Sequence, residues 1–315
     1  MKNDYSLSRR TFIKTASSAV STLALAGPTL SLRAVTSERK LTRFQIACMT
    51  LPYSQFPLQR ALQGIAESGF KFVAWGTKHQ ESPGRQAPVI DVDAKPSEAR
   101  ILADRCRDLG LTPILMFSTV YVEAEGSVDA HKKRIAQAAA AGIPQVLTFG
   151  HTEKGKREAW IRNLKELGPF ARSAGVTIVI KQHGGETATG EMCAKIVRDV
   201  ADDAVWMSYD AGNVMDYLDV NPIPDIRKCV SEIRSFCIKD HRNFPKDEDC
   251  GPGFGEIDHY QLLAPIAYTG LSMPLACENI FAPVVPRPGT PEGVDLLAKR
   301  AREFLETVIA GLQAG

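Results

Sequence analysis

The sequence predicts an α/β domain built as a closed barrel of eight parallel strands, each followed by a helix. Two patterns indicate this fold. Apolar runs repeatedly end in charged residues, as IVI does at Lys181 and PLAC does at Glu278. Helical patterns repeatedly end at a glycine before a new apolar run, as at Gly142. Because the carboxyl ends of the strands converge on one face of such a barrel, we expect these charged residues to share one site.

The glycines set the spacing of the predicted elements. A residue just past a helix end often adopts a left-handed backbone conformation that favours glycine, and five glycines fit that position. The gap between Gly175 and Gly270 holds two further strands, so units of about 33 residues complete a (β/α)8 barrel, or TIM barrel. The predicted strands are 44–49, 70–75, 111–117, 143–149, 176–181, 204–209, 233–239 and 273–278. The predicted helices are 57–68, 95–108, 128–141, 155–173, 188–200, 223–232, 258–268 and 291–311.

These elements define one domain over residues 42–311. The strands are continuously apolar, as strands buried on both faces are. Thr290 can cap the last helix, and Pro291 suits its first turn. Two long loops at 80–96 and 241–257 are rich in proline, glycine and charge, and both follow strand ends. We predict that they act as lids.

The first 26 residues have the features of an export signal. Residues 8–14 contain a twin arginine, a modest apolar stretch follows at 16–26, and residues 24–26 offer a small-x-small cleavage site. This segment resembles bacterial twin-arginine signals, which implies export of a folded protein to the periplasm. The apolar stretch is far shorter than the ~20 residues that span a bilayer, so we expect no stable membrane insertion after cleavage. Residues 27–41 are predicted to be a linker.

Charge and cysteine content exclude two classes of protein. The first 26 residues carry four basic side chains and one acidic one, so their removal lowers the formal charge from +2 to −1. No basic patch then remains to indicate nucleic-acid binding. The seven cysteines include no C-x-x-C pair, and a chain folded in a reducing compartment is not expected to depend on disulfides.

Several short motifs, in order, resemble one known family. They are residues 69–73 at the second strand, His183-Gly184-Gly185, Asp210-x-Gly-Asn213, Ile238-Lys239-Asp240, residues 253–258 and Glu278. Together they resemble the xylose isomerase-like barrels of sugar isomerases, epimerases and endonuclease IV-type enzymes over about residues 42–311. In that family a divalent cation is usually held by a Glu, an Asp, a His and a Glu on strands five to eight. Asp210 and Glu278 match this set, whereas Lys181 and Cys237 replace the other two ligands.

The replaced ligands favour a site without a metal cofactor. If Lys181 and Lys239 point inward, their ammonium groups neutralise the two carboxylates of Asp210 and Glu278. An added divalent cation would then leave uncompensated positive charge in a partly buried site. The alternative is a zinc or manganese ion held by Asp210, Glu278, His183 and Cys237, with His241 as a possible substitute for the thiolate.

Three residues are the candidate catalytic groups. Glu278 can remove a proton from the carbon beside a carbonyl, and Lys181 can stabilise the resulting oxyanion or return the proton. Asp210 completes the group as the partner of the ammonium. A purely structural ion pair among the three is the alternative.

Other polar and aromatic residues near strand ends are candidate substrate-binding groups. Asp240 is expected to anchor backbone amides instead, because it lies on the opposite strand face. The candidates are His183, Asn213, Lys239, His241, Trp75 and His151.

We therefore predict an exported carbohydrate-active enzyme of the sugar isomerase or epimerase type, which forms an enediolate from a sugar or keto-sugar. Elimination on an oxidised (keto) glycoside, a lyase or hydrolase-type reaction, would use the same intermediate. A non-catalytic glycan-binding barrel is the alternative from another class. The expected partner is a small carbohydrate.

Overall fold

The computed structural model describes residues 40–151 and 156–314. The predicted signal at 1–26 and residues 27–39 of the predicted linker lie outside the described residues, so export stays a prediction. Within the described ranges, no helix combines the length and apolar composition needed to cross a bilayer.

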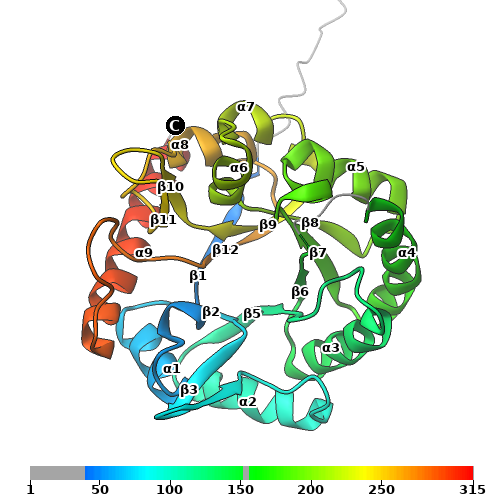
Figure 1. Cartoon of the computed structure of the whole chain (residues 1–315), viewed down its shortest axis with the longest axis horizontal. Coiled ribbons are helices and arrows are strands. Elements are labelled where there is room, and N and C mark those ends of the chain that lie inside the picture. The colour runs from blue at the N-terminus through cyan, green and yellow to red at the C-terminus, as the bar shows by residue number, and fades with distance from the viewer. Residues whose placement is uncertain (1–39, 152–155, 315) are drawn as a thin grey trace, which may run out of the picture. The chain divides into compact units, whose positions relative to one another are not determined.

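The predicted barrel is confirmed. Eight parallel strands close in the order β1-β12-β9-β8-β7-β6-β5-β2, with β2 pairing again with β1. In Figure 1 the strands form a central ring with the helices around it. Every strand end lies within two residues of its predicted position. The strands are β1 (Arg43–Met49), β2 (Phe72–Trp75), β5 (Thr112–Phe117), β6 (Gln145–Thr148), β7 (Thr177–Lys181), β8 (Val205–Tyr209), β9 (Ile233–Ile238) and β12 (Ser272–Cys277).

The helices follow the predicted pattern with three differences. The segment 258–268 forms only α8 before a 3₁₀ turn, since Pro265 disfavours a helical residue before it. The segment 223–232 forms α7 and a 3₁₀ turn, and the unpredicted α6 begins directly after β8. The helices are α1 (Leu58–Glu67), α2 (Pro96–Asp108), α3 (Ser127–Ala141), α4 (Arg157–Ser173), α5 (Gly190–Val200), α6 (Ala211–Leu218), α7 (Pro222–Ile226), α8 (His259–Leu263) and α9 (Pro291–Gln313).

The barrel has an inner and an outer apolar layer. Successive strand residues alternate between the two, so Val179 points inward while Ile178 and Ile180 pack toward the helices. The outer layer joins strands and helices, and the predicted helix-end glycines support the turns between them: Gly142 has φ 70° where α3 ends. Inward residues fill the barrel interior, which is therefore a packed core. They include Ala47, Met49, Ala74, Leu115, Leu147, Val179, Cys237 and Ala276.

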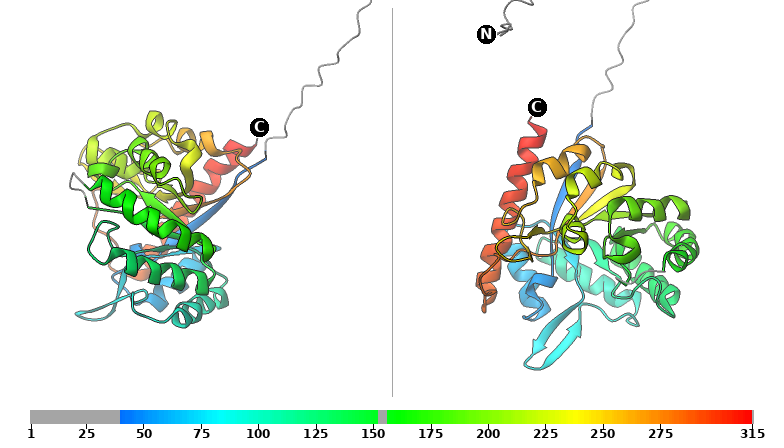
Figure 2. Two further views of the ribbon diagram at one scale, coloured as in Figure 1. Left: turned by 90° about the vertical axis from the view of Figure 1, so that its right-hand side faces the viewer. Right: turned by 45° about the horizontal axis from the view of Figure 1, so that its top comes forward.

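Both predicted lid loops contain β-hairpins. β3 (Lys78–Ser82) pairs with β4 (Arg85–Pro88), and Figure 2 shows this hairpin projecting from the barrel. β10 (Asp240–Arg242) pairs with β11 (Glu248–Cys250) directly after β9. The second hairpin and the loop behind it are thus built into the mouth of the barrel.

Asp240 anchors this second loop, as the sequence predicted. Its fully buried carboxylate accepts four backbone N–H bonds, from His241, Gly253, Gly255 and Ile257, at 2.9–3.0 Å. Gly255 is required for this approach, because a Cβ there would lie 2.3 Å from an Asp240 oxygen. A charged acceptor with several N–H donors is among the stronger hydrogen-bonded groups in proteins.

Asp240→Asn is expected to destabilise the protein by about 3 kcal/mol, because the amide NH₂ cannot accept the bonds that one carboxylate oxygen now accepts. Urea unfolding measures the loss. Asp258→Asn is the matched control, since Asp258 caps α8 through the Gln261 N–H and asparagine caps equally well. Equal losses in the two variants would contradict the anchoring role.

Candidate functional site

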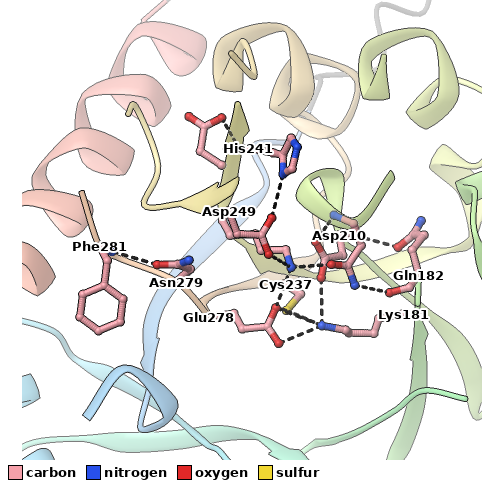
Figure 3. Close-up of polar contacts among 12 residues, drawn as sticks. Lys181, Gln182, Asp210, Cys237, His241, Asp249, Glu278, Asn279 and Phe281 are labelled. Atoms are coloured by element: carbon pink, nitrogen blue, oxygen red, sulfur yellow. Dashed lines mark hydrogen bonds and ion pairs between the residues drawn. The ribbon is translucent and has the colours of Figure 1, made fainter. Parts of the chain in front are cut away.

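Lys181 lies at the centre of the site. It is the last residue of β7 and, two residues after Val179, points into the barrel mouth. Its Nζ lies 2.9 and 3.0 Å from the two oxygens of Glu278 and 3.0 Å from Asp210 Oδ2. Figure 3 shows the three side chains converging from β7, β8 and β12. The predicted meeting of these residues in one place is confirmed.

The three groups hold one another in their charged forms. Burial opposes the Lys181 ammonium, but the neighbouring carboxylates of Glu278 and Asp210 outweigh burial and raise the pKa of Lys181 above its ordinary value. Burial also opposes the Glu278 carboxylate, yet Lys181 and Lys239 lower the pKa of Glu278 far below its ordinary value. At neutral pH, Glu278 is therefore a carboxylate and Lys181 an ammonium, which excludes Lys181 as a resting neutral amine.

Cys237 completes the potential ligand group for a metal. Its Sγ lies 3.1 Å from Glu278 Oε2 and 3.6 Å from Lys181 Nζ. Burial and Glu278 raise the pKa of Cys237, so the sulfur is a neutral thiol at pH 7. Donor atoms of Asp210, Cys237 and Glu278 lie within 4.8 Å of one another, which is close enough to hold a metal.

The ammonium prevents this donor group from fitting a divalent cation. Zinc binds oxygen, nitrogen or sulfur ligands at about 2.0–2.3 Å, and thiol sulfur must first lose its proton. Lys181 Nζ lies within hydrogen-bond distance of both carboxylates, in the place such an ion would take. His183, the fourth predicted ligand, is not part of this donor group.

Asp210 is held by its own local structure. It caps α6 by accepting the Asn213 N–H at 3.0 Å, and its own N–H donates to Gln182 at 2.8 Å. Asn213 Nδ2 donates to the Gln182 carbonyl oxygen, and Asn213 Oδ1 accepts from Lys239. Asn213 is buried, and the protein binds both the Oδ1 and the Nδ2 of its side chain. It therefore supports the site, and its predicted contact with substrate is wrong.

Lys239 and His241 are tied together by Asp249, a residue the sequence did not indicate. Asp249 on β11 accepts from Lys239 Nζ at 2.7 Å and pairs with His241 Nδ1 at 3.0 Å. His241 is fully buried, and its Nε2 lies 3.1 Å from Asn243 Oδ1. Both ring nitrogens of His241 thus have partners within the protein. The predicted contact of His241 with substrate is therefore wrong. Lys239 remains at the edge of a pocket.

That pocket opens beside Glu278 and has a volume of about 290 Å³. Ligand pockets for drug-sized molecules start near 300 Å³, so this one suits a ligand the size of a monosaccharide. Its lining combines charged, polar and apolar side chains, as recognition of a hydroxylated ring requires. The lining residues are Leu51, Pro52, Ser54, Lys239, Asp249, Glu278, Asn279, Phe281 and Arg287.

His183 lies within an aromatic cluster whose other members follow β5 and β6 or belong to α6. Its ring centroid lies 5.0 Å from Phe149, 5.7 Å from Tyr217 and 6.2 Å from Tyr121. Nδ1 donates to the Gly150 carbonyl at 2.6 Å, and burial lowers the pKa of His183. His183 is therefore neutral at pH 7, with Nε2 as an acceptor.

His151 is exposed at the edge of this cluster. Its ring centroid lies 3.8 Å from that of Tyr121, and its backbone N–H donates to the Glu123 side chain at 2.6 Å. The structure places His151 beside this aromatic cluster, and its contact with substrate stays a prediction. The aromatic residues around it were missed in the sequence, although Phe149 directly follows a strand.

Trp75 does not reach the mouth. It is 1% exposed and belongs to the outer layer between the strands and the helices. Ala74 is the residue of β2 that points inward, so alternation directs Trp75 toward the helices. The predicted contact of Trp75 with substrate is therefore wrong.

The comparison with known families agrees with this geometry. The sequence profile of the xylose isomerase-like TIM barrel family matches residues 62–300. The chain belongs to this family. None of the curated proteins matches the sequence.

Three solved structures illustrate the likeness. A xylose isomerase-like TIM barrel/4-hydroxyphenylpyruvate dioxygenase fusion protein is 19% identical with a TM-score of 0.67, and the match covers 87% of this chain and 44% of that one. An L-ribulose 3-epimerase is 19% identical with a TM-score of 0.65, over 85% of this chain and 95% of that one. The IOLI protein with a zinc atom is 16% identical with a TM-score of 0.63, over 85% of this chain and 97% of that one. At these identities the likeness establishes the fold alone.

Lys181→Met is expected to cost about 3–5 kcal/mol at pH 7, because it leaves buried carboxylates without their ammonium. The pH dependence should change as well. In the wild type, the contribution of Glu278 is lost only as pH falls through its lowered pKa, and that of Lys181 only as pH rises through its raised pKa. In the variant, a carboxyl pKa rises instead, so stability decreases as pH increases from 5 to 8.

Urea unfolding at several pH values tests this expectation. Lys228→Met is the control, since Lys228 pairs with Glu191 at a similar 2.8 Å on the exposed surface. We expect the free energy of unfolding of Lys228→Met to differ little from that of the wild type at any pH. A Lys181→Met protein with the wild-type pH profile would contradict the assigned charges.

Proposed function

We propose that this protein is an exported enzyme of the sugar isomerase or epimerase type, which removes a proton from the carbon beside a carbonyl of a sugar or keto-sugar. One observation carries the proposal: an ammonium and a carboxylate, Lys181 and Glu278, lie 2.9 Å apart beside a pocket of monosaccharide size. Enolisation needs an electrophile and a base, and this pair supplies both. The relation to an L-ribulose 3-epimerase in fold supports the choice of substrate class.

The two groups have complementary roles. Lys181 Nζ donates a hydrogen bond to the carbonyl oxygen, and Glu278 takes the proton from the adjacent carbon. The C–H electron pair forms the C=C bond of the enediolate, and the carbonyl electrons move to the oxygen beside Lys181. Return of the proton by Glu278 to the neighbouring carbon gives isomerisation. Delivery of a proton from the Lys181 ammonium to the opposite face of the original carbon gives epimerisation, after which Glu278 passes its proton to Lys181 and both groups regain their starting charges. Loss of a leaving group from the next carbon gives elimination on a keto-glycoside.

Substrate binding itself adjusts the basicity of Glu278. In the free site, Lys181 and Lys239 lower the pKa of Glu278, which makes it a weak base. A carbonyl oxygen that accepts a bond from Lys181 takes that bond away from Glu278, so the carboxylate becomes more basic when substrate is present. Asp210, at 3.0 Å from the ammonium, keeps Lys181 charged and in place.

The aromatic cluster fits a carbohydrate ligand. Tyr121, Phe149 and Tyr217 are partly exposed around His183 at the mouth. Rings of this kind can pack against the apolar C–H faces of a sugar, while neutral His183 Nε2 can accept a bond from a hydroxyl.

We further propose that the enzyme works without a divalent metal, because Lys181 supplies the positive charge in the place of the ion. The resemblance of residues 1–26 to a twin-arginine signal supports a periplasmic location within this proposal.

Metal analysis of protein purified without chelator tests the metal-free proposal. We expect no stoichiometric zinc or manganese in the wild type. The double variant Lys181→Glu with Cys237→His restores the ligand set that the family resemblance implies, and we expect it to bind one divalent ion per chain. Stoichiometric metal in the wild type would overturn the proposal.

Deuterium exchange tests the enolisation. Incubation with D-ribulose, D-xylulose and D-fructose in D₂O is expected to place deuterium at the carbon beside the carbonyl, as NMR detects. Glu278→Gln should lower this rate about 10³-fold, because a general base contributes about 10²–10⁴.

Glu191→Gln, which changes an exposed carboxylate, is the control and should exchange at the wild-type rate. A wild-type protein that binds these sugars without exchange, with the same affinity in Glu278→Gln, would instead indicate a non-catalytic glycan-binding barrel.

A further inference from the structure

The segment after β12 carries a second functional group besides Glu278. Asn279 Oδ1 accepts the Phe281 N–H at 2.9 Å, and the Phe281 carbonyl accepts the Gly251 N–H at 2.8 Å. Phe281 is therefore fixed in place, 7% exposed, at the wall of the 290 Å³ pocket; Figure 3 shows its ring beyond Asn279. The Arg287 guanidinium lies over this ring, with Cζ 4.4 Å from the centroid.

Stacking on Phe281 prepares Arg287 to bind an anion. A guanidinium stacked on an aromatic ring keeps its N–H donors in the plane, at the edge of the stack. These donors match the two oxygens of a carboxylate in a bidentate arrangement. A flexible lysine at this position would have neither the stacking nor the planar fork.

Arg287 differs from the other charged residues of the pocket because no carboxylate of the described residues pairs with it. Lys239 pairs with Asp249 at 2.7 Å, and Glu278 pairs with Lys181 at 2.9 Å. Among residues 40–151 and 156–314, no carboxylate forms an ion pair with Arg287, although Arg287 lines the same pocket. The three cations Lys181, Lys239 and Arg287 balance the three carboxylates Asp210, Asp249 and Glu278 in total, but the ion pairs of the carboxylates leave the Arg287 guanidinium available to an anion.

We propose that this pocket binds a sugar acid of monosaccharide size, with its carboxylate on Arg287 and its carbonyl end at Lys181 and Glu278. This inference rests on the proposed function and specifies its substrate class. A carboxylate matches a single guanidinium in charge and shape. A phosphate monoester has close to two negative charges at pH 7 and would leave one of them without a partner.

The carboxylate serves to orient the substrate. Binding energy from a part of the substrate that does not react can hold the reacting carbon in place. Glu278 and Arg287 lie on the same segment after β12 and line the same pocket, so an anion fixed on Arg287 places the other end of the sugar beside Glu278.

Calorimetric titration with three probes tests this assignment. D-glucuronate and D-glucose differ in carrying a carboxylate or a CH₂OH at one end, and D-glucose 6-phosphate carries a phosphate there. We expect the wild type to bind D-glucuronate about tenfold more tightly than either of the other two. Arg287→Met should bring the affinities for D-glucuronate and D-glucose within about twofold of each other. The preference of Arg287→Lys for D-glucuronate should lie between those of the wild type and Arg287→Met.

Arg100→Met, which changes an exposed arginine of α2, is the control and should keep the wild-type preference. Equal affinity of the wild type for D-glucuronate and D-glucose would overturn the proposal, as would an unchanged preference in Arg287→Met. Tighter binding of D-glucose 6-phosphate than of D-glucuronate, lost in Arg287→Met, would overturn the carboxylate assignment in favour of a phosphate.

The sugar-acid assignment and the proposed enolisation can fail independently of each other. Glu278→Gln leaves Arg287 in place, so the preference for D-glucuronate should persist in that variant even though deuterium exchange is lost. Exchange on neutral keto-sugars without a preference for D-glucuronate would contradict only the sugar-acid assignment. A preference for D-glucuronate without exchange on any sugar would contradict only the enolisation.

Discussion

The site depends on one buried ammonium. Lys181 is 3% exposed, and it neutralises carboxylates that reach the mouth from two other strands. Without it, Asp210 and Glu278 would be like charges in a poorly solvated place, and one of them would bind a proton. Glu278 is therefore a carboxylate at neutral pH because Lys181 is present, and Asp210 can at the same time cap α6.

The sequence predicted the barrel and its central residues for a physical reason. Closure of eight parallel strands brings their carboxyl ends together, so residues far apart in sequence, such as Lys181 and Glu278, become neighbours by topology alone. Apolar runs and helix-end glycines were enough to place the strands. The role of Asp240 was predictable too, because alternation along the strand directs it away from Lys239 and toward the backbone of the following loop.

The residues that the sequence misassigned depend on contacts outside that pattern. Trp75 ends an all-apolar strand, where composition does not tell inward from outward positions, and its neighbour Ala74 takes the inward one. The ring of His241 pairs with Asp249. Asp249 belongs to a hairpin strand without an apolar run, so the sequence pattern did not reveal it. Arg287 follows the last strand within a proline-rich loop, and only its stacking on Phe281 distinguishes it from an ordinary surface arginine.

A tethered ammonium differs from a bound divalent ion in ways that suit this site. It carries one charge instead of two, so it polarises a carbonyl less strongly, but it can also donate a proton to the developing oxyanion. It cannot dissociate, so its presence does not depend on the supply of metal where the folded protein resides. With only one positive charge at the centre, Lys239 at 3.7 Å from Glu278 becomes useful as a second cation. The pair of lysines thus provides the total charge that a divalent ion would bring, divided between two strands and fixed by covalent bonds.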